Sequence, residues 1–137
     1  MRIGVDASCW SNKRGFGRFT RELLSSLLAT DTRDEFVFFV DSQTGCESEF
    51  PSSAEVVVAR TNAPAIEAAA ASGRRSIPDL LSMSKAVWRH KIDLFFFPTV
   101  YTYFPILNRT KIVLTIHDVI AEHHPELIFP NSRAQLF

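Results

Sequence analysis

A run of cations and glycines at residues 13–18 is the first segment whose composition suits chemistry, because an amphipathic pattern follows it directly. The first turn of a helix carries unpaired N–H groups and partial positive charge, so extra cations there are mildly unfavourable unless an anion joins them. The glycines would let a phosphate or carboxylate approach the backbone. The pattern predicts either an anion-binding loop or a flexible turn with solvated charges. The residues of the predicted anion site are Gly15, Phe16, Gly17 and Arg18.

A polar pair, His117 and Asp118, follows an apolar run at residues 111–116. Ligands of helix-flanked parallel sheets bind beyond the carboxyl ends of the strands, and this pair falls at such an end. The imidazole there can donate a hydrogen bond to a sugar hydroxyl or a phosphate, while the carboxylate orients it or accepts a substrate hydroxyl. The alternative is structural, with the histidine bonded to backbone carbonyls and the aspartate capping the segment that follows.

Aromatic and hydroxyl side chains fill a loop at residues 98–105, after another apolar run. Tyr101 and Tyr103 in this loop suit a sugar or a lipid-linked acceptor. Packing against a further part of the chain explains these two tyrosines equally well. The loop is therefore a candidate acceptor site.

The elements that must position these residues alternate between strand and helix patterns. The expected strands lie at residues 3–5, 35–41, 56–58, 93–98 and 111–116. The expected helices lie at residues 19–28, at residues 63–71 and from residue 78 onward. Several strands are apolar on both faces, which is typical of strands covered by helices on both sides. The pattern predicts an α/β, Rossmann-like domain with a mainly parallel sheet and flanking helices.

Some connections carry more detailed expectations. Residues 42–53 are too polar for a buried crossover helix, so the strands on either side should form a hairpin or an excursion at a sheet edge. Gly73 is expected to cap the alanine-rich helix, and Pro78 suits the first turn of the next one. The predicted apolar side of that helix consists of Leu80, Leu81, Ser84, Val87 and Trp88. Residues 130–137 resemble the start of a helix, which suggests a truncated chain.

The composition limits the size of the fold and the class of partner. The chain has 137 residues, 15 Lys and Arg against 15 Asp and Glu, and 46% apolar residues. That length accommodates one domain, residues 1–137, and the zero net charge argues against nucleic acid as a partner. No apolar run approaches the roughly 18 residues that cross a bilayer. Cys9 and Cys46 are expected to remain free thiols.

Four blocks of sequence, taken in order, resemble the N-terminal half of group 1 (family 4) glycosyltransferases. The blocks are residues 1–7 (MRIGVDA), 15–24 (GFGRFTRELL), 93–98 (DLFFFP) and 111–118 (KIVLTIHD). The second and fourth blocks together are the most specific part of the resemblance, which covers nearly the whole chain. It implies a GT-B enzyme, in which two Rossmann-like domains face each other across a cleft. The first domain then binds mainly the acceptor and the second binds the nucleotide-sugar.

The resemblance also implies a reaction. A sugar passes from a nucleotide-sugar to a glycan or lipid-linked acceptor, with retention of configuration and without a metal or other cofactor. Carried over by position, Gly15 to Gly17 face the donor diphosphate, His117 lies by the transferred sugar and Asp118 supports that site. The family's donor-holding Glu-x7-Glu pair belongs to a second domain that this chain does not contain. Residues 1–137 alone are therefore expected to be inactive.

The resemblance further implies a cytoplasmic enzyme, and it leaves open both a peripheral attachment to the inner face of the membrane and self-association through the surface left by the missing domain. Two other hypotheses compete with it. One is a stand-alone, non-enzymatic module that binds an anionic, phosphorylated ligand at residues 15–18. The other is a metal-dependent hydrolase built on His117, His123 and His124. The spacing of these histidines is a poor match to known zinc motifs, so we expect no metal.

Overall fold

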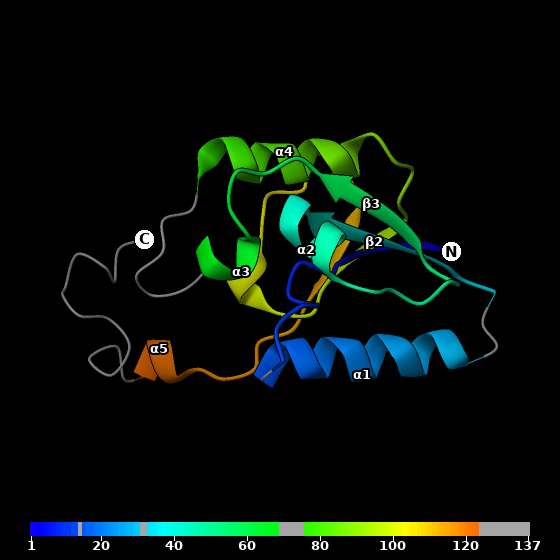
Figure 1. Cartoon of the computed structure of the whole chain (residues 1–137), viewed down its shortest axis with the longest axis horizontal. Helices are drawn as coiled ribbons and strands as arrows, with labels where there is room; N and C mark the ends of the chain where they lie inside the picture. Colours follow the sequence, from blue (N-terminus) through cyan, green and yellow to red (C-terminus); the bar gives the residue numbers. More distant parts are fainter. Residues whose placement is uncertain (14, 31–32, 69–75, 124–137) are drawn as a thin grey trace.

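The computed structural model of the chain describes residues 1–13, 15–30, 33–68 and 76–123 (Figure 1). In chain order, its elements are β1 (Arg2–Asp6), α1 (Gly15–Ala29), β2 (Glu35–Asp41), α2 (Ser42–Glu47), β3 (Glu55–Ala59), α3 (Ala65–Ala68), α4 (Ile77–Trp88), β4 (Leu94–Phe97), the 3-10 helix η1 (Val100–Thr102), β5 (Lys111–Leu114) and α5 (Ile120–His123). Strands and helices alternate for most of the chain, as the sequence predicts.

All five strands run parallel and form one sheet in the order β3-β2-β1-β4-β5. The central strand is β1, where Val5 pairs with Phe38 of β2 on one side and with Phe96 of β4 on the other. The chain builds the sheet outward from β1 to β3 and then continues on the other side with β4 and β5. The order therefore reverses between β1 and β4, and α/β sheets hold their ligands beside such a reversal. The predicted α/β, Rossmann-like parallel sheet is confirmed.

Two apolar layers hold the sheet between α1 on one face and α4 on the other (Figure 1). Leu24 and Phe38 belong to the layer under α1, and Val87 and Phe95 to the layer under α4, each at most 1% exposed. Successive side chains of a strand point to opposite faces, so Phe39 of β2 joins the second layer. Burying a side chain of this size fully contributes roughly 1.5–3 kcal/mol. The predicted coverage of β2 on both faces is confirmed.

The connection from β2 to β3 corrects the expectation of a hairpin. The two strands pair in parallel, and α2 forms part of the crossover between them. Asp41 begins this helix, because its carboxylate accepts hydrogen bonds from the backbone N–H and the hydroxyl of Thr44 at 2.9 and 3.0 Å. A polar sequence thus forms a crossover here because an N-cap bond starts its short helix. The alternative expectation of an edge position is correct, since β3 is an edge strand.

The helix α4 begins as predicted, with Pro78 in its first turn. Its buried side differs from the predicted stripe. Leu81 and Trp88 are 52% and 62% exposed, whereas Met83, which the stripe omitted, is 3% exposed. The helix is therefore rotated about its axis so that Met83, Ser84 and Val87 face the sheet.

Several expectations fall on residues that the structure does not describe. The helix predicted at residues 63–71 is present as α3 up to Ala68, and Gly73 lies outside the described residues. The helix expected at residues 130–137 also lies outside them. Among the described helices, none is long and apolar enough to cross a membrane.

The strand β5 departs most from the expectation that apolar runs are covered on both faces. Ile112, Val113 and Leu114 are 45%, 46% and 37% exposed. Because adjacent side chains point to opposite faces, both faces of β5 are open to solvent in the part of the chain that the structure describes. The strand itself forms as predicted, in parallel with β4, but its predicted burial is wrong.

Candidate functional site

The predicted anion loop and the predicted histidine lie at the same edge of the sheet. The helix α1 begins at Gly15, and the segment after β5 brings His117 against it. The centroid of the His117 ring lies 4.9 Å from that of Phe19, edge to face, and 6.4 Å from that of Phe16. Two segments about a hundred positions apart in the sequence therefore meet at the carboxyl edge of the sheet.

A third segment completes this contact. The ring centroid of Tyr101, in η1 after β4, lies 5.5 Å from that of Phe16. We call Phe16, Phe19, Tyr101 and His117 the aromatic rim. Phe19 and Tyr101 are each 38% exposed, so the rim is open to solvent. Aromatic rings with an exposed face can pack on the apolar face of a sugar ring.

Tyr103 does not join the aromatic rim. Its ring centroid lies 4.9 Å from that of Phe97, and the side chain packs against the apolar layer under α4. The chain turns through η1, so that Tyr101 and Tyr103 face different parts of the molecule. The structure thus separates the two tyrosines that the sequence grouped as acceptor-binding residues.

His117 and Asp118 both make the bonds of the structural alternative. The His117 Nε2 lies 2.9 Å from the carbonyl oxygen of Pro98, and the Asp118 Oδ1 accepts a hydrogen bond from the Ile120 N–H at 3.1 Å. A carbonyl only accepts, so Nε2 must carry a proton, and in the neutral ring Nδ1 is then the free acceptor. The bond to Pro98 fixes the ring without occupying Nδ1.

The two glycines of the predicted anion loop have different structural roles. Gly15 has φ +45°, a left-handed conformation that favours glycine, and no other group lies within 4 Å of the position of a Cβ. A Cβ on Gly17 would lie 2.2 Å from the Asn12 oxygen and 2.7 Å from the Cys9 oxygen. Gly17 therefore lets α1 pack closely on the loop after β1, a packing role that the sequence did not indicate.

Two arginines near the start of α1 also differ. The Arg21 guanidinium donates hydrogen bonds to the carbonyl oxygens of Trp10 and Asn12, so it holds the loop after β1 in place. Arg18 is exposed, and the ion pairs among the described residues involve only the N-terminal Met1 and Arg2 as cations. The charge of Arg18 is therefore available to an anion from solvent. Arg14 lies outside the described residues.

Sequence reasoning missed a group of buried polar side chains at the same edge. Asp6, the last residue of β1, and Ser8 are fully buried, and Thr102 in η1 is 2% exposed. Burial raises the pKa of Asp6 to about 6; hydrogen bonding by Thr102 and Ser8 lowers this pKa, and the charge of Asp41 raises it. The available signal was an aspartate at the end of an apolar run, a pattern that Asp41 repeats at the end of β2.

Neither cysteine forms a disulfide, as the sequence predicts. Cys9 is buried with its Sγ 3.2 Å from the Thr20 hydroxyl, and burial raises the pKa of Cys9 to about 12. A thiol with so high a pKa is a poor nucleophile at neutral pH. Cys46 is exposed, away from the predicted site residues in the sequence.

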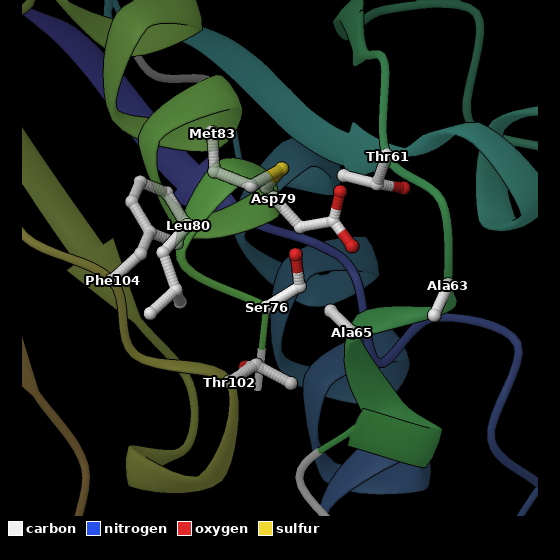
Figure 2. Close-up of a pocket in the computed structure, with 9 residues that line it drawn as sticks. All are labelled: Thr61, Ala63, Ala65, Ser76, Asp79, Leu80, Met83, Thr102 and Phe104. Atoms are coloured by element: carbon white, nitrogen blue, oxygen red, sulfur yellow. The ribbon is translucent and has the colours of Figure 1, made fainter. Parts of the chain in front are cut away.

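A pocket lies beside η1, on the α4 side of the sheet (Figure 2). Figure 2 shows the Ser76 hydroxyl and the Asp79 carboxylate pointing into the same space. Asp79 Oδ1 also accepts hydrogen bonds from the backbone and side-chain nitrogens of Asn62, at 2.9 and 3.0 Å. The lining residues are Thr61, Ala63, Ala65, Ser76, Asp79, Leu80, Met83, Thr102 and Phe104. The adjacent residues Tyr101 and Thr102 therefore belong to the aromatic rim and to this pocket, respectively.

Within the described part of the chain, no three His, Cys, Asp or Glu side chains form a group that could hold a metal ion. His124 lies outside it, so the three-histidine hypothesis falls partly on residues that the structure does not describe. His117 is already bonded to the Pro98 carbonyl through Nε2.

No protein-family model, no curated protein and no solved structure matches the chain. The main feature that points to a function is the meeting of the α1 terminus, η1 and the segment after β5 at one edge of a parallel sheet.

Proposed function

We propose that this chain is the N-terminal, acceptor-side domain of a retaining, metal-independent GT-B glycosyltransferase, which transfers a sugar from a nucleotide-sugar to a glycan or lipid-linked acceptor. One observation carries the proposal. The exposed start of α1, with Arg18, meets His117 at the carboxyl edge of the sheet, where the ring centroids of His117 and Phe19 are 4.9 Å apart. This edge is where α/β sheets bind their ligands.

Each group at the edge has a role in this proposal. Arg18 and the first N–H groups of α1 attract the donor diphosphate, because cationic and N–H donors together bind phosphate oxygens well. The aromatic rim packs against a sugar ring, with Tyr101 on the acceptor side. The free Nδ1 of His117 accepts a hydrogen bond from a sugar hydroxyl. Asp118 acts indirectly, because its bond to Ile120 holds the segment that follows His117.

The second candidate is a non-enzymatic module that binds a phosphorylated ligand. The bonds of His117 to Pro98 and of Asp118 to Ile120 favour this candidate, because they give both side chains a structural role. Such a module needs only the start of α1 and Arg18. The two candidates differ in whether a sugar attached to the phosphates contributes to binding.

Binding measurements on the chain separate these candidates. Inorganic diphosphate and a panel of nucleotide-sugars are titrated by calorimetry into the wild type and into Arg18→Gln, with Arg89→Gln as the matched control at an exposed arginine after α4. We expect Arg18→Gln to weaken diphosphate binding at least several-fold, more strongly at low ionic strength, and Arg89→Gln to leave it unchanged. Equal effects of the two substitutions, or no binding of any compound, would contradict an anion site at α1.

The sugar then decides between the candidates. In the glycosyltransferase domain, one nucleotide-sugar binds more tightly than bare diphosphate, and His117→Ala removes that advantage while leaving diphosphate affinity intact. In the binding module, neither the sugar nor His117 matters. Because the donor-holding pair is expected on a second domain, the chain alone should show no transfer, and ordinary turnover by residues 1–137 would refute that part.

A further inference from the structure

Three oxygens of buried side chains near the carboxyl ends of β1 and β4 lack a hydrogen-bond partner at regular geometry. They are the Asp6 Oδ2, the Ser8 Oγ and the Thr102 Oγ1, and we call these three residues the Asp6 cluster. An unpaired buried polar group costs about 1–3 kcal/mol, and a charged one costs more. Three of them in one place require a physical explanation.

The members of the Asp6 cluster are neighbours. The hydroxyls of Thr102 and Ser8 are close enough to lower the pKa of Asp6, although neither completes a regular hydrogen bond to Oδ2. The other carboxylate oxygen, Oδ1, accepts a hydrogen bond from the Ser8 N–H at 3.1 Å. One carboxyl group and two hydroxyls therefore share a buried site, and each of the three has an oxygen without a regular hydrogen-bond partner.

Thr102 connects this site to the aromatic rim. It is the last residue of η1, a three-residue turn that Thr99 caps by accepting a hydrogen bond from the Tyr101 N–H at 3.3 Å. Tyr101 precedes Thr102 directly, and its ring contacts Phe16 at a centroid distance of 5.5 Å. In so short a turn, a displacement of Thr102 also displaces the backbone of its neighbour Tyr101.

Thermodynamic linkage gives the sign of the coupling. The nearby hydroxyls of Thr102 and Ser8 lower the pKa of Asp6, so they favour its ionised form. Coupling between two equilibria is reciprocal. Ionisation of Asp6 must therefore strengthen the interaction between its carboxylate and the two hydroxyls, and protonation of Asp6 must weaken this interaction.

We propose that Asp6 is a positioning residue, whose ionised carboxylate accepts hydrogen bonds from Ser8 and Thr102 and thereby holds η1 so that Tyr101 stays in the aromatic rim. This inference rests on the proposed function in one respect, which is the assignment of Tyr101 to the acceptor side. Burial raises the pKa of Asp6 to about 6, so the contact of Tyr101 with Phe16 is tight above this pH and loosens below it.

Other charged or titratable groups surround the Asp6 cluster. Asp41, at the end of β2, raises the pKa of Asp6 by its charge. The Cys9 thiol lies in the same buried loop, and the guanidinium of Arg21 on α1 donates to the carbonyl oxygens of Trp10 and Asn12. In the described part of the chain, no ion pair involves Asp6. Hydroxyl groups are thus the principal stabilisers of its charge.

The test is an NMR titration of the chain from pH 4 to 8 with ¹³C-labelled aspartate and tyrosine. We expect the Asp6 carboxyl signal and the Tyr101 ring signals to move with a common midpoint near 6, the pKa to which burial raises Asp6. Histidine side chains in general titrate in the same range, so the titration is repeated in His117→Gln. The Tyr101 transition should remain in His117→Gln and disappear in Asp6→Asn.

Substitution of the hydroxyls tests the proposed route. In Thr102→Val, the Asp6 signal should still titrate, with a higher midpoint, while Tyr101 no longer follows it; Thr102→Ser should restore the common midpoint. Ser8→Ala should also raise the midpoint. Its matched control is Ser84→Ala, which removes another fully buried hydroxyl, one bonded to Leu80 on α4, and should change nothing in this titration.

Two outcomes would overturn the inference. One is a Tyr101 transition that survives in Asp6→Asn and disappears in His117→Gln, because the imidazole and not the carboxyl would then control the ring. The other is a Tyr101 ring that does not respond to pH while Asp6 titrates. The measurement needs no nucleotide-sugar, so it gives its answer even if the proposed glycosyltransferase function fails the binding experiments.

Discussion

The strands β2 and β5 have similar sequences and opposite surroundings. Both are continuous apolar runs without the alternation of a half-exposed strand. In β2, the side chains from Phe36 to Asp41 are buried on both faces, whereas every residue of β5 is exposed. The difference lies in what packs around them. β2 lies between two strands and between two apolar layers, and β5 is an edge strand in the described part of the chain.

The comparison separates two properties that apolarity encodes. An apolar run specifies that a segment can form a strand, and β5 does form one in register with β4. Burial itself also requires neighbouring elements on both faces. A similar contrast holds for the aspartates at the carboxyl ends of these strands. Asp41, the last residue of β2, is fully buried and bonded to Thr44, while Asp118, after β5, is exposed. The next three predictions compare buried with exposed positions, first in these two strands and then elsewhere, beginning with the largest effect.

Alanine substitutions in the two strands should differ most. Phe38→Ala should lower the free energy of unfolding by about 3–5 kcal/mol, because it leaves a cavity in the layer under α1. In the size-matched pair, Val37→Ala should cost about 2–3 kcal/mol and Val113→Ala less than ~1 kcal/mol, since Val113 is 46% exposed. Urea unfolding followed by circular dichroism measures all three. Equal costs for Val37→Ala and Val113→Ala would mean that β5 is covered in solution.

The buried Asp6 carboxyl at the end of β1 should give a pH-dependent difference in stability of intermediate size. Burial raises the pKa of Asp6 from 3.8 to about 6, so stability due to this group is complete below pH 3.8 and is lost as the pH rises through 6. The Asp6→Asn variant has no carboxyl group to ionise, so it does not lose this stability. Its free energy of unfolding, relative to that of the wild type, should increase by up to ~3 kcal/mol between pH 4 and 7. Urea unfolding of both proteins across this range measures the difference. A constant difference would show that Asp6 is not desolvated.

The smallest contrast concerns the two glycines of α1. Gly17→Ala should cost about 1–3 kcal/mol, because its Cβ would overlap the Asn12 carbonyl and force the loop to move. Gly15→Ala should cost about 1 kcal/mol, from the left-handed backbone alone. Thermal unfolding of both variants ranks them. If Gly15→Ala were the more damaging substitution, the start of α1 would pack differently from the structure described above.

Most of the fold follows from local patterns. The strands, α1 and the Pro78 start of α4 were predictable because apolar runs, helical spacing and proline act within a few residues. The parallel pairing of β2 with β3 was missed because an N-cap bond from Asp41 starts a helix in a polar segment. The rotation of α4 was missed because it depends on which side chains pack against the sheet. Met83 packs there, whereas Leu81 points to solvent.

The candidate site was predictable only in part. The position of His117 after a strand followed from the apolar run that precedes it, whereas its contacts with Phe16 and Phe19 come from the folded structure. The separation of Tyr101 from Tyr103 and the packing role of Gly17 depend on the turn η1 and on the loop after β1. Such loops are shaped by contacts distant in sequence, so composition alone did not indicate which side chains would share a surface.

The two thiols of the chain differ in a way that makes them internal reporters. Cys46 is exposed, whereas Cys9 is buried against Thr20 beneath the start of α1, and burial raises the pKa of Cys9 to about 12. An alkylating reagent should therefore modify the first immediately and the second only when α1 moves away from the sheet. The rate of the slower modification would measure how often the helix that carries the proposed phosphate site opens.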